Sequence, residues 1–391
     1  MSTSEDSDYL PFCRPSIGEE EIAEVVDTLR SVWLTTGPKT RAFEQAFGAY
    51  TGASHSVALN SCTAGLHLAL LAAGVTEGDE VILPSLTFCA TANVIVHRRA
   101  TPVFAEIEEA SYTLDPASFE QRITPRTKAV IPVHHGGQVC DMRRINEIAA
   151  KHGITVIEDA AHAAGAKLDD VPVGNISAFT SFSFYATKNL TTGEGGMLTT
   201  NDSAAAERIR VLALHGISAD AWKRYSKEGS WYYEVLEPGF KYNMTDIQAS
   251  IGLHQLAKLD TFVAQREQIA TRYTTAFHDL PDVIVTPIIR PGVRHAWHLY
   301  PIRLRTGRLR IDRAGFVAEL ANRGIGASVH FIPVHLHPFY RDTFGCRRGD
   351  LPITERVYDE FVSLPLFPSM TAAETERVIA AVRGIVADYS L

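Results

Sequence analysis

The segment from Ser181 to Thr200 reads S-F-S-F-Y-A-T-K-N-L-T-T-G-E-G-G-M-L-T-T and decides how the chain is interpreted. Its first residues are apolar and aromatic with a period of two, which predicts a buried strand that ends near Ala186. A single lysine, Lys188, follows, and a glycine-rich loop then leads into a second strand. Because glycines let the backbone pass close to a flat ligand, the stretch suits a Schiff-base lysine. Taken alone, it is explained equally well by a surface lysine before a hairpin.

Strand and helix patterns alternate along the first part of the chain. Strands are predicted at residues 56–59, 80–83, 102–106, 129–133 and 154–157. Helices are predicted at residues 17–31, 40–50, 63–73, 87–97, 115–122 and 141–152, with N-caps at Asp115 and Asp141. Alternation at this spacing predicts an α/β fold with a mostly parallel sheet and helices on both faces.

A change in composition separates the last third of the chain from the residues before it. A helical pattern runs from Thr245 to Phe277, either continuous or broken once, and prolines 281, 287 and 291 follow it. Beyond them we expect strands at 298–304 and 327–331, a helix opened by Asp312, and helices near 354–362 and 371–388. With 391 residues the chain is too long for one compact core. We therefore predict a large domain over 10–255 and a smaller α+β domain over 256–391.

Composition excludes several classes of protein. The chain is 46% hydrophobic and 21% charged, as in ordinary globular proteins, and its formal net charge of −8 includes no basic block that would favour nucleic acid. No apolar run is long enough to span a membrane. Residues 1–9 are acidic and serine-rich, which predicts a disordered tail and not a secretory leader. Five scattered cysteines without a C-x-x-C pair indicate free thiols in a reducing cytoplasm.

Two segments carry polar groups at the ends of predicted strands. The sequence N-S-C-T-A-G at 60–65 opens a helix, so its backbone N–H groups either bind an anion or are capped by Ser61 or Thr63. Asp159 and His162, in E-D-A-A-H, follow an apolar strand at the position where open α/β sheets bind ligands. Asp159 suits either an acid that pairs with a protonated ring nitrogen or a simple N-cap. His162 is either its polar neighbour or a packed helix residue.

Three further candidates are weaker when taken singly. Phe88 begins a helix after a strand and either stacks on a planar cofactor or belongs to the core. Residues 239–246 form either an anion-binding loop or a plain polar loop before the long helix. Histidines at 330, 335 and 337 are favoured as the lining of a substrate cleft over metal ligands, because proline interrupts them and no cysteine or carboxylate motif accompanies them. We expect no metal site.

Six motifs in this order resemble the DegT/StrS-type sugar-nucleotide aminotransferases, which are pyridoxal 5'-phosphate (PLP) enzymes of the aspartate aminotransferase fold, fold type I. The motifs are W-L-T-T-G-P, N-S-C-T-A-G-L-H-L-A-L, P-S-L-T-F-C-A-T-A-N, E-D-A-A-H-A, F-S-F-Y-A-T-K-N and T-G-E-G-G-M. The resemblance runs from about Pro15 to the C-terminus. It implies PLP as cofactor, a large domain with a mostly parallel seven-stranded-type sheet sandwiched by helices, a smaller C-terminal domain, and a homodimer with shared active sites.

The resemblance also implies roles for individual residues. Lys188 is expected to form the Schiff base with PLP and to move the proton between substrate and cofactor. Asp159 would hold the pyridine nitrogen protonated, His162 would lie beside the ring hydroxyl, and Phe88 would stack on the ring. The implied phosphate ligands are the backbone at Cys62 and Thr63, the Thr63 hydroxyl, Ser183, and Asn243 of the neighbouring subunit.

One departure from the family pattern leaves an assignment open. Many relatives carry N-Y-R or N-S-R before the long helix, whereas this chain has K-Y-N, so the cross-subunit phosphate ligand is either Lys241 or Asn243. The expected substrate contacts are Trp33, Tyr185, Lys241, His330 and Phe331. Loops at 222–236 and 330–340 are expected to contact the nucleotide base and to set stereochemistry.

The implied reaction moves an amino group from L-glutamate to a nucleotide-linked keto-6-deoxy sugar. The K-Y-N form, P-V-H at 132–134 and histidine in place of glutamine at 162 are more similar to enzymes that aminate the 4-position. The alternatives are a 3-keto sugar or cyclitol aminotransferase, a PLP dehydratase, and a non-catalytic regulator of the same fold. Lys188 argues against the dehydratases, which carry histidine there, and the intact site residues argue against the regulator.

Overall fold

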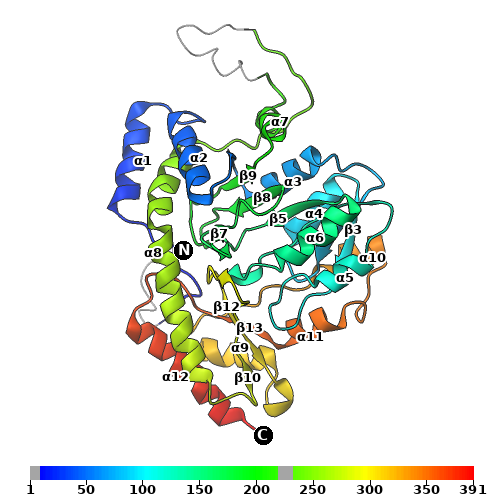
Figure 1. Cartoon of the computed structure of the whole chain (residues 1–391). Coiled ribbons are helices and arrows are strands. Elements are labelled where there is room, and N and C mark those ends of the chain that lie inside the picture. Colours follow the sequence, from blue (N-terminus) through cyan, green and yellow to red (C-terminus); the bar gives the residue numbers. More distant parts are fainter. Residues whose placement is uncertain (1–8, 219–231) are drawn as a thin grey trace.

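The computed structural model describes residues 9–218 and 232–391, and it is built around one large sheet (Figure 1). The seven strands of this sheet are, in spatial order, β1 (His55–Leu59), β9 (Gly196–Thr200), β8 (Phe179–Ser183), β5 (Thr155–Asp159), β4 (Thr127–Val130), β2 (Glu80–Pro84) and β3 (Thr101–Ala105). The pairings from β8 to β3 are parallel, and β9 runs antiparallel to both of its neighbours. The predicted α/β class and the mostly parallel sheet are confirmed.

Alternating strand residues pack against helices on opposite faces of the sheet. Ile82 points to a core that contains residues of α2 (Pro38–Thr51), α5 (Pro116–Gln121), α6 (Met142–His152) and α8 (Asp246–Phe277). Its neighbours Val81 and Leu83 point to a second core, formed with α3 (Cys62–Ala72), α4 (Cys89–His97) and α7 (Ser203–Ala213). Burial of both faces explains why the inner strand β2 carries consecutive apolar residues from Val81 to Pro84.

Side-chain caps fix the helix starts close to their predicted positions. The Asp115 carboxylate accepts a hydrogen bond from the Ala117 N–H at 2.9 Å, and Asp141 accepts one from the Arg144 N–H at 3.2 Å. Thr245 and Gln248 form a reciprocal capping box at the start of α8. The helix then continues for 32 residues without the break that the sequence left open.

The C-terminal part packs against a smaller sheet. Its strands are β10 (Ile284–Val285), β12 (Tyr300–Leu304) and β13 (Phe361–Leu364), and its helices are α9 (Arg313–Asn322), α10 (Pro338–Phe344), α11 (Pro352–Glu360) and α12 (Ala372–Tyr389). A further small sheet joins β11 (Val293–Arg294), β6 (Lys167–Leu168) and β7 (Val171–Pro172). None of the helices in the described ranges is both long and apolar enough to cross a bilayer.

Two predictions about the C-terminal part are wrong. Residues 327–331 form no strand, because only Ser328 pairs with a neighbour, Ser363, and the residues after it turn toward a cavity. The helix expected over 354–362 ends at Glu360, because Phe361–Leu364 pairs with β12 as a strand. Helices α7 and α10 were not predicted.

The long helix α8 joins the two parts of the chain (Figure 1). Its first half packs on α1 (Glu19–Ser31) and α2, and its residues up to Val263 belong to the core of the large sheet. From Ile269 onward its buried residues belong to the core of the C-terminal part. The boundary expected at residue 255 therefore falls inside a continuous helix, and the division into 10–255 and 256–391 stays a prediction.

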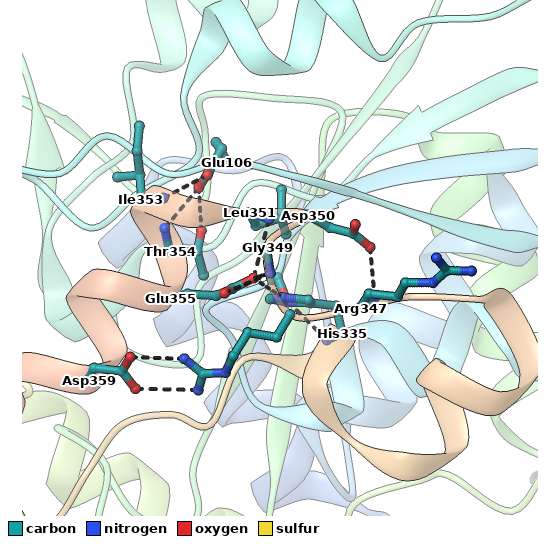
Figure 2. A network of polar contacts seen from close by, with 12 residues as sticks. Glu106, His335, Arg347, Gly349, Asp350, Leu351, Ile353, Thr354, Glu355 and Asp359 are labelled. Atoms are coloured by element: carbon teal, nitrogen blue, oxygen red, sulfur yellow. Dashed lines mark hydrogen bonds and ion pairs between the residues drawn. The ribbon is translucent and has the colours of Figure 1, made fainter.

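Figure 2 shows a polar network that fixes the C-terminal part to the large sheet. The Glu106 carboxylate, just after β3, accepts hydrogen bonds from the N–H groups of Ile353 and Thr354, each at 2.9 Å, at the start of α11. Glu355 lies 3.0 Å from Nε2 of His335. Nδ1 of His335 lies 2.7 Å from the hydroxyl of Ser85, which follows β2. The network therefore holds the segment that carries His330 and Phe331 beside the carboxyl ends of the strands.

Candidate active site

A cavity of about 430 Å³ lies where β5 and β8 end. The starts of α3 and α4 form one side of it, and residues of the C-terminal part form the other. Ten of the predicted site residues line this cavity: Cys62, Thr63, Phe88, Asp159, His162, Ser183, Tyr185, Lys188, His330 and Phe331. The sheet edge thus brings together side chains that lie more than 250 residues apart in the sequence.

Lys188 lies in the loop after β8, where its backbone N–H donates to the Tyr185 carbonyl at 2.9 Å. The side chain is half-buried and faces the cavity lining, not a hairpin surface. Burial lowers the pKa of Lys188 to about 8, although the nearby Asp159 charge opposes this shift. About one tenth of the amine is therefore uncharged at pH 7, far more than for a lysine in water, and a nucleophilic lysine requires this form.

Asp159 is the last residue of β5 and is only 5% exposed. One carboxylate oxygen accepts from the Thr91 hydroxyl at 2.8 Å, and the other accepts from the Ala161 N–H at 3.1 Å. Burial raises the pKa of Asp159, while these hydrogen bonds and the charge of Lys188 lower it in part. The N-cap alternative is wrong, because the described residues between Asp159 and β6 form no helix, and the carboxylate forms part of the cavity lining.

His162 and Phe88 contribute rings to the cavity. Nδ1 of His162 accepts from the Gly136 N–H at 3.2 Å, and burial holds the pKa of the imidazole well below its usual value, so the ring is neutral. The His162 ring lies nearly parallel to that of Phe331, with centroids 5.8 Å apart. Phe88 is 57% exposed and tilts against Phe331 at 5.7 Å, so its ring is not part of a core.

The first turn of α3 offers an anion site at the edge of the cavity. The Ser61 hydroxyl caps the helix by accepting from the Ala64 N–H at 3.1 Å. The N–H groups of Cys62 and Thr63 have no acceptor among the residues that the structure describes. A free first turn of this kind binds phosphate, and the Thr63 and Ser183 hydroxyls line the same region. The Cys62 thiol instead turns to Ser181, whose hydroxyl is 3.3 Å away.

Gly196 allows the first turn of α3 to lie directly against β9. A Cβ at this position would lie 2.4 Å from the backbone carbon of Ser61 and 2.6 Å from the backbone nitrogen of Cys62. A buried acid, a lysine and a free helix N-terminus therefore share one cavity. This donor set matches the ring nitrogen, the aldehyde and the phosphate of PLP, so the residues fit that cofactor.

Three predicted residues lie outside this cavity. Trp33, Lys241 and Asn243 line a separate hollow of about 590 Å³ between α2, β1 and α7. Within it the Asn243 amide donates to the Thr36 hydroxyl at 2.7 Å. A single chain therefore does not bring these residues to Lys188. Part of the predicted base-contacting loop, residues 222–231, and the predicted tail, apart from Tyr9, lie outside the described residues.

The structure adds residues to the site that sequence reasoning missed. Thr91 lies one helical turn after Phe88, a spacing that could have indicated a second cavity residue on the same helix. Phe12 and His298 also line the cavity but belong to segments far from every motif used above. His298 lies two residues before β12, and its only sequence signal was a histidine at the start of a predicted strand.

Comparisons with known proteins agree with this geometry. The model of the DegT/DnrJ/EryC1/StrS aminotransferase family matches residues 15–383. The chain is 55% identical over 380 residues to "Uncharacterized protein MJ1066" of Methanocaldococcus jannaschii, and the alignment covers 97% of this chain and 98% of that protein. It is 53% identical over 379 residues to the spore coat polysaccharide biosynthesis protein SpsC of Bacillus subtilis, with 97% of each chain covered.

A solved structure supports the cofactor assignment. Spr1654 of Streptococcus pneumoniae, assigned as a sugar aminotransferase, matches with a TM-score of 0.90 at 35% identity, covering 97% of this chain and 98% of that one in its PMP form. Its PLP form matches equally well and covers 99% of that chain. Family, fold and site agree, so the chain belongs to the DegT/DnrJ/EryC1/StrS aminotransferase family and is a PLP-dependent sugar aminotransferase.

Proposed function

We propose that this aminotransferase takes the amino group of L-glutamate and transfers it to a nucleotide-linked keto-6-deoxy sugar, at the 4-position. The observation that carries the proposal is the placement of Lys188, whose pKa is lowered to about 8, in one cavity with Asp159 and His162. The 4-position rests on the K-Y-N sequence before α8 and on histidine at position 162.

Each residue of the cavity has a distinct task in this proposal. Asp159 would hold a proton at the cofactor's ring nitrogen, His162 would donate from Nε2 to the ring hydroxyl, and Phe88 would cover one face of the ring. Bound PLP supplies an electron-poor ring that stabilises negative charge at the substrate carbon. Lys188, as a neutral amine, would hold the cofactor covalently and then move a proton at that carbon.

The phosphate would be held by the first turn of α3. The N–H groups of Cys62 and Thr63 and the hydroxyls of Thr63 and Ser183 are the proposed donors within one chain. In the same account Tyr185, His330 and Phe331 would contact the sugar. The aromatic rings suit the apolar face of a pyranose, because an apolar surface with few polar groups is typical of small-molecule sites.

We place the remaining residues in a homodimer. Trp33, Lys241 and Asn243 line a hollow away from the Lys188 cavity, so they are available to a neighbouring subunit. We propose that this surface completes the partner's site, with Lys241 or Asn243 reaching the phosphate. We also place the enzyme in the cytoplasm, where its five free cysteines would remain reduced.

The test is a substrate panel. Purified enzyme with PLP and L-glutamate is given dTDP- and UDP-linked 4-keto-6-deoxy sugars, their 3-keto isomers and cyclitol ketones, and the amino product is identified by mass spectrometry and NMR. The proposal predicts 4-amino products together with 2-oxoglutarate. Amination confined to 3-keto sugars or cyclitols would contradict the proposed position or substrate, and dehydration without amination would contradict the reaction.

A further inference from the structure

His298 forms part of the cavity wall, and no role has so far been assigned to it. The residue is 6% exposed, lies two residues before β12 and lines the cavity. Its ring lies 4.3 Å from that of His162, with an interplanar angle of 33°. The two imidazoles thus present neighbouring edges to whatever occupies the space beside Lys188.

The amide of Asn189 fixes which nitrogen of His298 carries the proton. Nδ2 of Asn189 donates to the Ala296 carbonyl at 2.6 Å, and only the amide nitrogen can make that contact. The amide oxygen of Asn189 therefore faces Nδ1 of His298 at 3.2 Å. Because this oxygen can only accept, Nδ1 of His298 bears the hydrogen and Nε2 keeps its lone pair.

His162 has the opposite arrangement. Its Nδ1 accepts from the Gly136 N–H, so its hydrogen is on Nε2. Among the described residues, neither Nε2 atom has a hydrogen-bond partner within the protein. The cavity wall therefore offers one donor from His162 and, beside it, one acceptor from His298.

The surroundings of His298 keep its ring neutral. Burial holds the pKa of the imidazole well below its usual value, and the charges of Lys188 and Arg266 add to this effect. Arg266 lies behind the wall, where its guanidinium donates to the Trp297 and His298 carbonyls at 3.3 and 3.4 Å. A ring with such a low pKa is a poor proton acceptor at neutral pH, so its lone pair serves as a hydrogen-bond acceptor.

We propose that Nε2 of His298 accepts a hydrogen bond from a ring hydroxyl of the sugar substrate and thereby selects the amino acceptor. The inference rests on the proposed function, because it requires a hydroxylated sugar beside Lys188. Apart from its reacting amine, glutamate presents only carboxylates, which have no proton to donate to this nitrogen. His298 should therefore matter more for the sugar half of the reaction than for the glutamate half.

Two substitutions separate the acceptor from the structural contact. In His298→Gln the amide oxygen can reach the position of Nε2, so the acceptor is retained. In His298→Asn the shorter side chain retains a polar contact to Asn189 but cannot reach the position of Nε2. Thermal unfolding of both variants checks that the fold is intact.

The assay measures the two half-reactions separately. Absorbance of the bound cofactor follows the reaction with L-glutamate. Product analysis follows the reaction with the keto sugar, which is dTDP-4-keto-6-deoxyglucose or the panel sugar that the wild type aminates. Analogues of this sugar that lack the 2- or 3-hydroxyl are assayed in the same way. We expect His298→Asn to lose about 10- to 100-fold in kcat/KM for the sugar, at least tenfold more than for glutamate. His298→Gln should recover most of this loss, and removing one of the two hydroxyls should cost the wild type but not His298→Asn.

A second readout needs no substrate. In ¹⁵N spectra of histidine-labelled protein, the signal that disappears in His298→Gln should report a neutral Nδ1–H tautomer between pH 6 and 8. An Nε2–H tautomer or a cationic ring would overturn the inference, as would a sugar reaction left intact in His298→Asn or an equal loss in both half-reactions. A wild-type enzyme that reacts with glutamate but aminates no keto sugar would instead refute the proposed function, and the inference with it.

Discussion

The contact between Gly196 and the first turn of α3 makes the cofactor site sensitive to a single methyl group. In Gly196→Ala the new Cβ would lie 2.4 Å from the Ser61 backbone carbon and 2.6 Å from the Cys62 nitrogen, whereas ordinary contacts begin at 3.4 Å. The obstructing atoms are backbone, so they cannot rotate away. Strand β9 and the start of α3 must separate by about 1 Å, which moves the N–H groups of Cys62 and Thr63.

The expected size of the effect follows from this displacement. Overpacking of this kind costs about 1–3 kcal/mol of folding free energy. Loss of one charge-assisted hydrogen bond to the phosphate costs about 1.5–3 kcal/mol, which raises the Kd for PLP by about 10- to 150-fold. We therefore expect Gly196→Ala to lower both the thermal stability and the cofactor affinity.

The measurement is a titration of apoenzyme with PLP, followed by absorbance, with urea unfolding of the same samples. Gly384→Ala is the matched control, because nothing lies within 4 Å of a Cβ there and the position is inside α12, where alanine stabilises a helix by up to about 1 kcal/mol. If Gly196→Ala binds PLP as tightly as the wild type does, the phosphate cannot lie on the first turn of α3, and this part of the account is wrong.

Three further predictions concern other parts of the site and fold. Burial lowers the pKa of Lys188 to about 8, and the Asp159 charge opposes this shift. The rate of PLP incorporation into apoenzyme should therefore rise with a midpoint at about pH 8, and Asp159→Asn should move that midpoint to lower pH. A shift of the midpoint to higher pH would contradict the geometry. Glu106→Ala leaves two N–H groups of α11 uncapped and should lower the free energy of unfolding in urea by about 1–2 kcal/mol. The control Asp359→Ala removes only an exposed ion pair and should lower it by less than about 1 kcal/mol. Equal losses in the two variants would contradict the capping role. Phe88→Ala should weaken PLP binding by about 2- to 10-fold in the same titration without lowering the thermal midpoint, because its ring is 57% exposed; unfolding at a lower temperature would show a core role instead.

The large sheet and half of the site could be predicted from sequence because both depend on local patterns. Asp159 ends β5 and Lys188 lies in the loop after β8, and parallel strands deliver such residues to one edge of a sheet. The cap at Asp141 depends only on its own helix, so its prediction is also confirmed. These features need no knowledge of what packs against them.

The remaining features depend on contacts that no local pattern records. Phe361–Leu364 is a strand because β12 lies beside it, and the sequence of the preceding helix α11 does not show where that helix ends. His298 and Asn189 meet across 109 residues, and the tautomer that this contact fixes is invisible in either segment alone. Residues 327–331 have the composition of a strand, but the polar network around His335 turns this segment into the cavity.

The most direct test of the account is to locate the covalent bond between protein and cofactor. Holoenzyme is reduced with borohydride, digested, and mapped by mass spectrometry for the pyridoxyl group. The account predicts the modification on Lys188 and its loss in Lys188→Ala, together with the loss of turnover. A pyridoxyl group on another lysine, or Lys188→Ala that transaminates at the normal rate, would contradict it.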